Sequence, residues 1–222
     1  DETQGSLSAH STSTAKPGRL PSSAANFTAK EALKTRTFWL LAAVIFFLQI
    51  GMAAVLVHIV PYLESVGVPR REAASAIAGV TVFSLIGRLG FGFLGDFKNK
   101  RYLIAIALFL QILGLFVFSL IEADKVWLII IFLLTYAPGY SGALTLRPAL
   151  QADYFGESSF GTIMGLTAAI AMPGGLSSPI VAGWIFDVTG SYRLAWQLFT
   201  LVISPAIPLI LLAKPPRAGT HS

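Results

Sequence analysis

The chain contains no cysteine among its 222 residues and only three histidines, so it can form neither disulfide bonds nor a thiol nucleophile. Charged residues are also scarce, at 12% of the chain, against about 25% in typical soluble domains. The sequence has no metal-ligand cluster, no glycine-rich dinucleotide motif and no phosphate-binding loop, and no signal-peptide pattern. These absences argue against disulfide-rich secreted proteins and nucleotide-dependent enzymes, and we expect no metal and no cofactor.

Apolar residues make up 55% of the chain, and the mean hydropathy is +0.71. A membrane-spanning helix needs about 20 mostly apolar residues. Six stretches meet this requirement, near residues 37–60, 73–95, 102–121, 126–148, 160–185 and 194–213. The sequence therefore predicts an all-α membrane protein with six transmembrane helices in a bundle over residues 36–214.

The two ends of the chain are polar. Residues 1–35 are rich in Ser, Thr, Ala and Pro, a composition typical of a disordered linker or tail, and residues 215–222 form a second short tail. The chain begins at Asp1 rather than at a methionine, so we expect it to be part of a longer protein whose preceding portion is missing.

Basic residues predict the orientation in the membrane, because they are enriched in cytoplasmic loops. With the N-terminal tail inside, the opposite side of the membrane holds only Arg70, Arg71, Lys125 and Arg193. The cytoplasmic side collects Lys16, Arg19, Lys30, Lys34, Arg36, Lys98, Lys100, Arg101, Arg147, Lys214 and Arg217. We therefore expect an integral protein of the plasma (inner) membrane with both termini cytoplasmic. The net charge of +5 is then explained by basic residues that face the anionic inner leaflet of a lipid bilayer, the expected partner. No nucleic-acid partner is needed to explain it.

Helix-breaking residues predict irregular spans. Pro61 is expected to close the first helix, residues 135–142 (TYAPGYSG) to interrupt the fourth near mid-depth, and Pro173 with Pro179 to break the fifth. Pro205 and Pro208 are expected to kink the sixth helix. A small-residue stripe over residues 161–169 is expected to allow close helix packing.

Arg88 is the ionisable residue that most needs an explanation, because it stands inside an otherwise apolar span. It lies eight residues before Asp96, about 12 Å from that helix end at 1.5 Å per residue. A buried-looking cation at this depth indicates a substrate or coupling site, where its planar fork would bind a carboxylate. A structural arginine paired with a neighbouring helix is the alternative.

Three motifs resemble the major facilitator superfamily: Gly92-x-Leu94-x-Asp96-x-x-x-Lys100-Arg101, the segment 183–192 (GWIFDVTGSY), and Pro61-Tyr62-Leu63-Glu64-x-x-Gly67. The first motif departs from the family pattern at Phe97 and Asn99. The resemblance covers residues 37–213 and implies the C-terminal half of a twelve-helix fold, built as a 3+3 inverted repeat. It also implies that the missing N-terminal six-helix half is a partner, and that residues 1–35 form the central loop.

Within the superfamily, Arg88 before Gly92 resembles the monocarboxylate transporter and oxalate/formate antiporter branch, in which this arginine contacts the substrate carboxylate. Two positions depart from that branch: Ser84 replaces an aspartate, and residues 160–186 contain no lysine. The resemblance implies a secondary transporter, a symporter or antiporter and not an enzyme, that moves small monocarboxylate-like anions by alternating access. A drug or sugar transporter and a six-helix subunit without transport activity remain alternatives.

The resemblance and the positions of polar residues in the predicted helices together give further candidate residues. Gln49, Tyr136, Tyr140 and Ser141 are expected to line the substrate cavity with Arg88. Gly92, Asp96, Lys100 and Arg101 are expected to form a cytoplasmic gate, in which the carboxylate holds the positive N-terminus of a neighbouring helix. His58 is a candidate for proton coupling, although an interfacial histidine is the plainer interpretation. Arg147 is expected to be an anchor at the membrane surface.

A different class of protein is suggested by Gly139-Tyr140-Ser141-Gly142 in the fourth helix, which resembles rhomboid intramembrane proteases. Their serine acts with a histidine of the sixth helix, and a nucleophilic serine requires a base within hydrogen-bond reach. The histidines of this chain are His10, His58 and His221, none of them in the sixth helix. The sequence therefore argues strongly against a protease.

Overall fold

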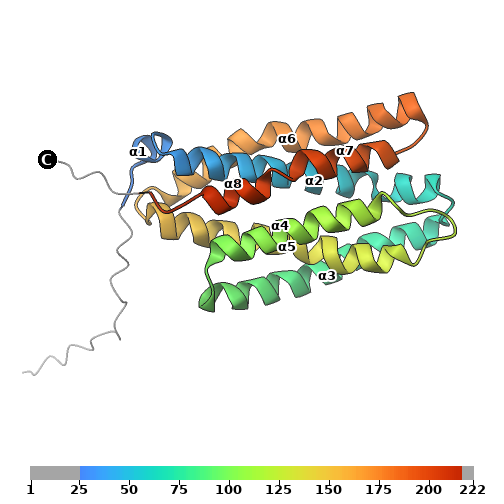
Figure 1. The fold of residues 1–222 in the computed structure, drawn as a ribbon, viewed down its shortest axis with the longest axis horizontal. Coiled ribbons are helices and arrows are strands. Elements are labelled where there is room, and N and C mark those ends of the chain that lie inside the picture. Colours follow the sequence, from blue (N-terminus) through green and yellow to red (C-terminus); the bar gives the residue numbers. More distant parts are fainter. Residues whose placement is uncertain (1–25, 217–222) are drawn as a thin grey trace, which may run out of the picture.

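The computed structural model describes residues 26–216, and all regular secondary structure in this part of the chain is helical. The helices are α1 (Ala29–Leu33), α2 (Arg36–Ser65), α3 (Arg70–Phe97), α4 (Lys100–Phe118), α5 (Leu128–Phe155), α6 (Phe160–Thr189), α7 (Arg193–Ile203) and α8 (Ala206–Leu212). Six spans are long and apolar enough to cross a membrane, with α7 and α8 together forming the sixth. They lie side by side along the long axis of the molecule (Figure 1). The predicted all-α fold is therefore confirmed.

The first span continues past the proline that was expected to close it. Pro61 lies inside α2, which ends at Ser65. The next residue, Tyr62, is buried, and its hydroxyl donates hydrogen bonds to the carbonyls of Phe118 at 2.6 Å and Ile121 at 3.1 Å. These contacts hold the last turn of α2 in place although Pro61 lacks a backbone donor. The prediction of a helix end at Pro61 is wrong.

The expected interruptions of the fourth and fifth spans are also wrong. Helix α5 runs through Pro138 and Pro148, and α6 runs through Pro173 and Pro179. In α5 the neighbouring glycine serves helix packing instead, since a Cβ built on Gly139 would lie 2.5 Å from a backbone nitrogen of α4.

The sixth span does break at a predicted position. Helix α7 ends at Ile203, and α8 begins after Pro205. Pro205 therefore marks the break, whereas Pro208 lies within α8.

Residues 26–35 were expected to be disordered, but they contain the capped helix α1. Thr28 and Glu31 form a capping box at its start. Phe27 is buried, packs edge-on against Phe155 at the end of α5, and donates its backbone N–H to the Phe155 carbonyl at 3.0 Å. The expectation fails here because Phe27 offers apolar surface to the bundle. Residues 1–25 and 217–222 of the expected tails lie outside the described residues.

The packing pattern shows the internal repeat. The main helix pairs are α2 with α6, α3 with α5, and α4 with α5, while α7 and α8 pack on α2 and α4. Exchanging α2 with α5, α3 with α6, and α4 with the α7–α8 span returns the same set of pairs. The two helix triplets therefore occupy equivalent positions, as an inverted repeat requires.

Two apolar cores are stacked along the bundle. We call the end that carries α1 and the α3–α4 and α5–α6 turns the α1 end, and the opposite end the far end (Figure 1). The far-end core includes Tyr62, Phe118 and Trp196, and the α1-end core includes Phe38 and Phe155. Helix α7 contributes to the far-end core and α8 to the α1-end core.

Candidate functional site

Helices α3 and α6 bury only one face each and expose large apolar side chains on the other. The exposed side chains include Val82, Leu85, Ile86, Leu89 and Phe93 on α3, and Met172, Leu176, Ile180, Trp184 and Val188 on α6. Contiguous apolar surface of this kind marks contact with lipid or with another protein segment. These two faces are therefore where further protein or lipid must cover the bundle.

Arg88 lies on α3 beside this exposed face. Within this chain it is exposed rather than buried, and it forms no hydrogen bond or ion pair with the residues that the structure describes. The buried face of α3, which includes Ser84 and Gly87, packs against α5, and Arg88 stands just past it. The expectation that Arg88 is buried is thus not met by these six spans alone, because no helix within residues 26–216 covers that side.

Ser84, one turn before Arg88, carries no charge that could neutralise the Arg88 guanidinium. Ser84 is buried, and its hydroxyl donates to the Thr81 carbonyl at 2.8 Å. No carboxylate therefore stands where an acidic partner one turn away would be, and Arg88 remains available to an external anion.

Two of the predicted cavity residues are used in helix packing. The Tyr136 hydroxyl is fully buried and donates to the Gly51 carbonyl of α2 at 3.0 Å. The Ser141 hydroxyl donates to the Pro138 carbonyl at 3.3 Å, and it faces α3, since a Cβ built on Gly87 would lie 2.5 Å from it. Both hydroxyls thus already have acceptors within the bundle.

Tyr140 and Gln49 differ from these residues. Tyr140 packs against Tyr136 with ring centroids 5.4 Å apart, and its hydroxyl makes no hydrogen bond among the described residues. Gln49 is half-buried on α2 and faces α6, where a Cβ built on Gly175 would lie 3.7 Å from the Gln49 Cβ. Both keep polar groups that can still take a partner.

His58 joins three elements at the far end of the bundle. Its Nε2 lies 2.9 Å from the Pro179 carbonyl of α6, and its Nδ1 lies 3.1 Å from the Tyr192 hydroxyl. Because a carbonyl can only accept, Nε2 carries the proton and donates, and Nδ1 of the neutral ring accepts from Tyr192. This geometry makes His58 a structural link between α2 and α6, and a second proton could enter only at Nδ1.

The predicted gate residues gather at the α1 end but do not all contact one another. Asp96 is exposed and forms no ion pair within the described part of the chain. Lys100 instead pairs with Asp153 of α5, at 2.6 Å. The Arg101 guanidinium lies 4.9 Å from the ring centroid of Tyr102, and it donates to the hydroxyl of that tyrosine at 3.1 Å.

The turn around this ion pair encloses a basic pocket of about 280 Å³. Its lining includes Lys98, Lys100, Arg101, Asp153 and Tyr154. Gly92 of α3 faces Thr145 of α5 without tight contact. A Cβ built on the glycine would lie 3.9 Å from the Thr145 Cγ2. The α1 end thus gathers several charged side chains, and the carboxylate that pairs with Lys100 is Asp153.

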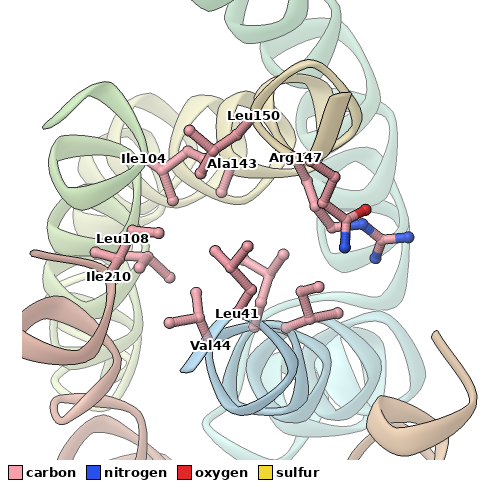
Figure 2. A pocket seen from close by; sticks show the side chains of 11 residues that line it. Leu41, Val44, Ile104, Leu108, Ala143, Arg147, Leu150 and Ile210 are labelled. Carbon is pink, nitrogen blue, oxygen red and sulfur yellow. The ribbon is translucent and has the colours of Figure 1, made fainter. Parts of the chain in front are cut away.

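Arg147 lies deeper than the surface position that the sequence predicted. It is half-buried in α5 and lines a small apolar cavity between α2, α4, α5 and α8 (Figure 2). Its Nε is buried and has no partner. The surface-anchor interpretation is wrong because α5 continues to Phe155, a further eight residues. Because the prediction placed the helix end near residue 148, Arg147 was assigned to the membrane surface and not to the interior of the span.

Comparison with known proteins agrees with the geometry. The sequence pattern of the Major Facilitator Superfamily matches residues 19–222. Monocarboxylate transporter 12 of Rattus norvegicus is 33% identical over 175 residues, which cover 75% of this chain and 35% of that protein. Monocarboxylate transporter 7 of Homo sapiens is 24% identical over 192 residues, covering 84% of this chain and 36% of that protein. The chain thus spans about a third of the length of these relatives.

A crystal structure of the superfamily transporter FucP in the outward conformation shares the fold, with a TM-score of 0.72 at 14% sequence identity. The superposition covers 85% of this chain and 46% of that one, so the chain corresponds to about half of that fold. Together with the six spans and their inverted repeat, these matches identify the chain as an integral membrane protein that belongs to the Major Facilitator Superfamily.

Proposed function

We propose that this chain is the C-terminal half of a secondary transporter that moves small organic anions, most specifically monocarboxylates, by alternating access. One observation carries the proposal: Arg88 stands about 13 Å inside its span, nine residues before the end of α3, without an acidic partner in the described chain. An arginine stays charged at physiological pH. A cation at this depth needs an anion to lower its cost, and a carboxylate solute supplies one.

The relatives support the substrate class. Proteins named monocarboxylate transporters match this chain over three quarters of its length. FucP, the fucose:proton symporter of E. coli, supports only the fold, because its identity to this chain is 14%. The absence of an acid at Ser84 and of a lysine in α6 leaves one unpaired arginine near mid-depth of α3, which suits a single negative charge.

The exposed faces of α3 and α6 would pack against a second six-helix half, which the greater length of the relatives can accommodate. That half would enclose Arg88 in a cavity between the two bundles. The guanidinium would then bind a carboxylate through two parallel hydrogen bonds. Gln49 and Tyr140 would add polar contacts at the cavity wall, while Tyr136 and Ser141 would hold α5 in position.

The α1 end would provide the gate. Lys100 and Asp153 would keep the α3–α4 turn close to α5 in one access state and separate in the other. Gly92 would allow α3 to slide past α5, and Asp96 and Arg101 would be free to contact the second half. His58 would take part in proton coupling only if protonation at Nδ1 reverses its hydrogen bond with Tyr192.

The charge distribution supports a cytoplasmic α1 end. Among the described residues this end carries seven basic side chains against four acidic ones: Lys30, Lys34, Arg36, Lys98, Lys100, Arg101 and Lys214 against Glu31, Asp96, Asp153 and Glu157. The far end carries Arg70, Arg71, Lys125 and Arg193 against Glu64, Glu72, Glu122, Asp124 and Asp187. We therefore place both termini of this chain on the cytoplasmic side of the plasma membrane.

Orientation can be tested with single cysteines, because the chain contributes no background thiol. Lys98→Cys and Asp124→Cys stand at opposite ends of the bundle. A membrane-impermeant maleimide applied to intact cells should label the second variant and not the first. The reverse pattern would overturn the orientation.

The substrate proposal is tested by uptake of labelled pyruvate, lactate and uncharged sugars into proteoliposomes that contain the full-length protein, with and without a pH gradient. We expect carboxylate uptake that falls about tenfold or more in Arg88→Gln, since a charge-assisted hydrogen-bond pair is lost. Arg71→Gln, an exposed arginine at the far end, is the matched control and should transport normally. Transport of sugars without carboxylates, or an unchanged Arg88→Gln variant, would refute the proposal.

A further inference from the structure

Arg147 is a second intramembrane cation for which the six-helix bundle offers no partner. It lies eight residues before the end of α5, about 12 Å from that helix end. Its Nε is buried and unpartnered, and none of the described residues accepts a hydrogen bond or forms an ion pair with its guanidinium. An unpaired buried charge destabilises a fold, so its presence at this depth requires a compensating function.

The nearest acid along α5 is already occupied. Asp153 lies six residues further on and pairs with Lys100 at 2.6 Å. One turn after Arg147, Gln151 is buried and donates to the Thr167 hydroxyl of α6 at 2.9 Å, while its Oε1 remains without a partner. The polar groups around Arg147 therefore include an amide acceptor that is short of a donor, but no carboxylate that could neutralise the charge.

Arg147 belongs to a polar stripe on one face of α5. Tyr136, Tyr140, Arg147, Gln151 and Tyr154 follow one another at spacings of four, seven, four and three residues, which brings them to one side of the helix. That side faces α2, because the Tyr136 hydroxyl bonds to Gly51 and the cavity below it is lined by α2 residues. Arg147 thus stands along the seam between α2 and α5, the helices that the inverted repeat makes equivalent.

The direction of the side chain separates it from the apolar cavity. Figure 2 shows the aliphatic part of Arg147 at the edge of the cavity and its guanidinium pointing away from the leucine and isoleucine side chains. The cavity has a volume of only about 20 Å³, which is too small for an organic anion. The guanidinium must therefore meet its anion outside this cavity, where the side chain points.

Arg147 and Arg88 lie close in depth. Helices α3 and α5 run parallel, and Gly92 faces Thr145, which aligns the two helices. Taking Gly92 and Thr145 as the same level, Arg88 lies four residues toward the far end and Arg147 lies two residues toward the α1 end. The axial offset between them is therefore about 9 Å at 1.5 Å per residue. An anion that moves from the level of Arg88 toward the α1 end therefore reaches the level of Arg147 within about two helical turns.

We propose that Arg147 is a second anion-binding residue, on the α1-end side of Arg88, that receives the carboxylate of the solute as it moves toward that end of the bundle. This inference rests on the proposed anion transport and adds its route: the solute leaves Arg88, meets Arg147 in the α2–α5 seam, and then reaches the Lys100–Asp153 gate. The two terminal nitrogens of Arg147 provide the donors for bidentate binding.

The test uses the full-length protein with pyruvate as the probe anion and pyruvamide as its uncharged analogue. Pyruvate affinity is measured by equilibrium binding, and thermal stability is measured on the same samples. Arg147→Met removes the charge and keeps the length of the side chain. We expect pyruvate affinity to fall about tenfold or more, while the melting temperature is unchanged or higher. A purely structural arginine predicts the opposite result, native affinity with a lower melting temperature.

Arg147→Lys decides the question if the methionine variant does not fold. Lysine keeps the charge but loses the fork, so we expect native stability with a pyruvate affinity measurably below the native value. Native affinity in Arg147→Lys together with native transport rates would overturn the inference. Arg71→Gln is again the matched control and should bind pyruvate like the native protein.

The two proposals fail in different ways. If the native protein binds no carboxylate, or Arg88→Gln binds pyruvate normally, the proposed function is wrong. If Arg88→Gln loses binding but Arg147→Met keeps it, only the second cation is wrong. A double variant that combines Arg88→Gln with Arg147→Met should lose less affinity than the two single losses multiplied, because both residues act on the same carboxylate.

Discussion

The ammonium group of Lys100 lies 2.6 Å from the carboxylate of Asp153, which joins the first residue of α4 to the last turn of α5. Since α3 leads directly into α4, this pair also fixes the position of the α3–α4 turn. The sequence analysis did not identify Asp153 as a partner of Lys100. Asp96, which was expected to hold the N-terminus of a neighbouring helix, forms no ion pair among the described residues.

Charge reversal tests this contact as a gate. The two side chains are 23% and 50% exposed, so the pair adds less than about 1 kcal/mol to stability. We expect Lys100→Asp and Asp153→Lys each to change uptake rates severalfold with little effect on melting temperature, and the double exchange to restore the native rate. Uptake kinetics in proteoliposomes measure both effects. Native rates in the single variants would show that the pair is an ordinary surface contact.

Gly114 permits a close approach between α4 and α5. A Cβ on this residue would lie 2.5 Å from the Cβ of Tyr136 and 2.6 Å from its backbone nitrogen. Backbone atoms cannot move aside locally, so Gly114→Ala should destabilise the protein by about 1–3 kcal/mol. Denaturation in detergent measures the loss. Gly161→Ala is the control, because no atom lies within 4 Å of the position that its Cβ would take.

The Tyr62 hydroxyl closes the far end of α4. It donates to two carbonyls, of Phe118 and Ile121, and is buried. Tyr62→Phe leaves at least one buried carbonyl without a donor and should cost about 1–3 kcal/mol of stability. Tyr102→Phe, at an exposed tyrosine, should change stability by less than about 0.5 kcal/mol. Equal melting temperatures for the two variants would contradict this role of Tyr62.

Glu122 connects the α4–α5 loop to the start of α7 through its contacts with Lys125 at 2.7 Å and Arg193 at 2.8 Å. The hydrogen bond from Lys125 lowers the pKa of Glu122, and the bond to Glu122 raises the pKa of Lys125. A lowered carboxyl pKa stabilises the fold above the unfolded value of about 4.3 and loses this effect as pH falls through the folded pKa. A raised lysine pKa stabilises below about 10.4 and loses its effect as pH rises through the folded pKa.

We therefore expect amide hydrogen exchange in residues 119–127, corrected for its intrinsic pH dependence, to be slowest between about pH 5 and pH 10 and to accelerate below pH 4. In Glu122→Gln the acid-induced acceleration should disappear, because the fast exchange is already present at neutral pH. Glu72→Gln, at an exposed carboxylate of the same end, should keep the native pH profile. A native profile in Glu122→Gln would show that the loop does not depend on these ion pairs.

The spans and the fold class were predictable because they depend on continuous apolar length, a property of local sequence. The prolines were misread for the same reason. Pro61 and Pro138 each remove one backbone bond, but the Tyr62 hydroxyl and the glycine contacts of α5 come from distant parts of the chain. Only the folded bundle shows that these tertiary contacts outweigh the missing bond.

The candidate site was predictable in part. Arg88 could be found because a single charge in an apolar run is conspicuous, and its unneutralised state could be inferred from Ser84. The actual roles of Tyr136 and His58 could not, since their acceptors, the carbonyls of Gly51 and Pro179, lie on other helices. Arg147 was misplaced because the helix end was set near Pro148, seven residues too early.

The last membrane span has its helix break at the level where the two stacked cores meet. Trp196 and Phe199 of α7 pack in one core, Ile210 of α8 packs in the other, and Pro205 between them has no N–H with which to continue the backbone ladder. If one core rocks against the other, the chain can therefore bend at Ser204–Pro205, and no helical hydrogen bond of α7 or α8 needs to break. The last span then connects the two cores through a joint that can bend, while each core keeps its own packing.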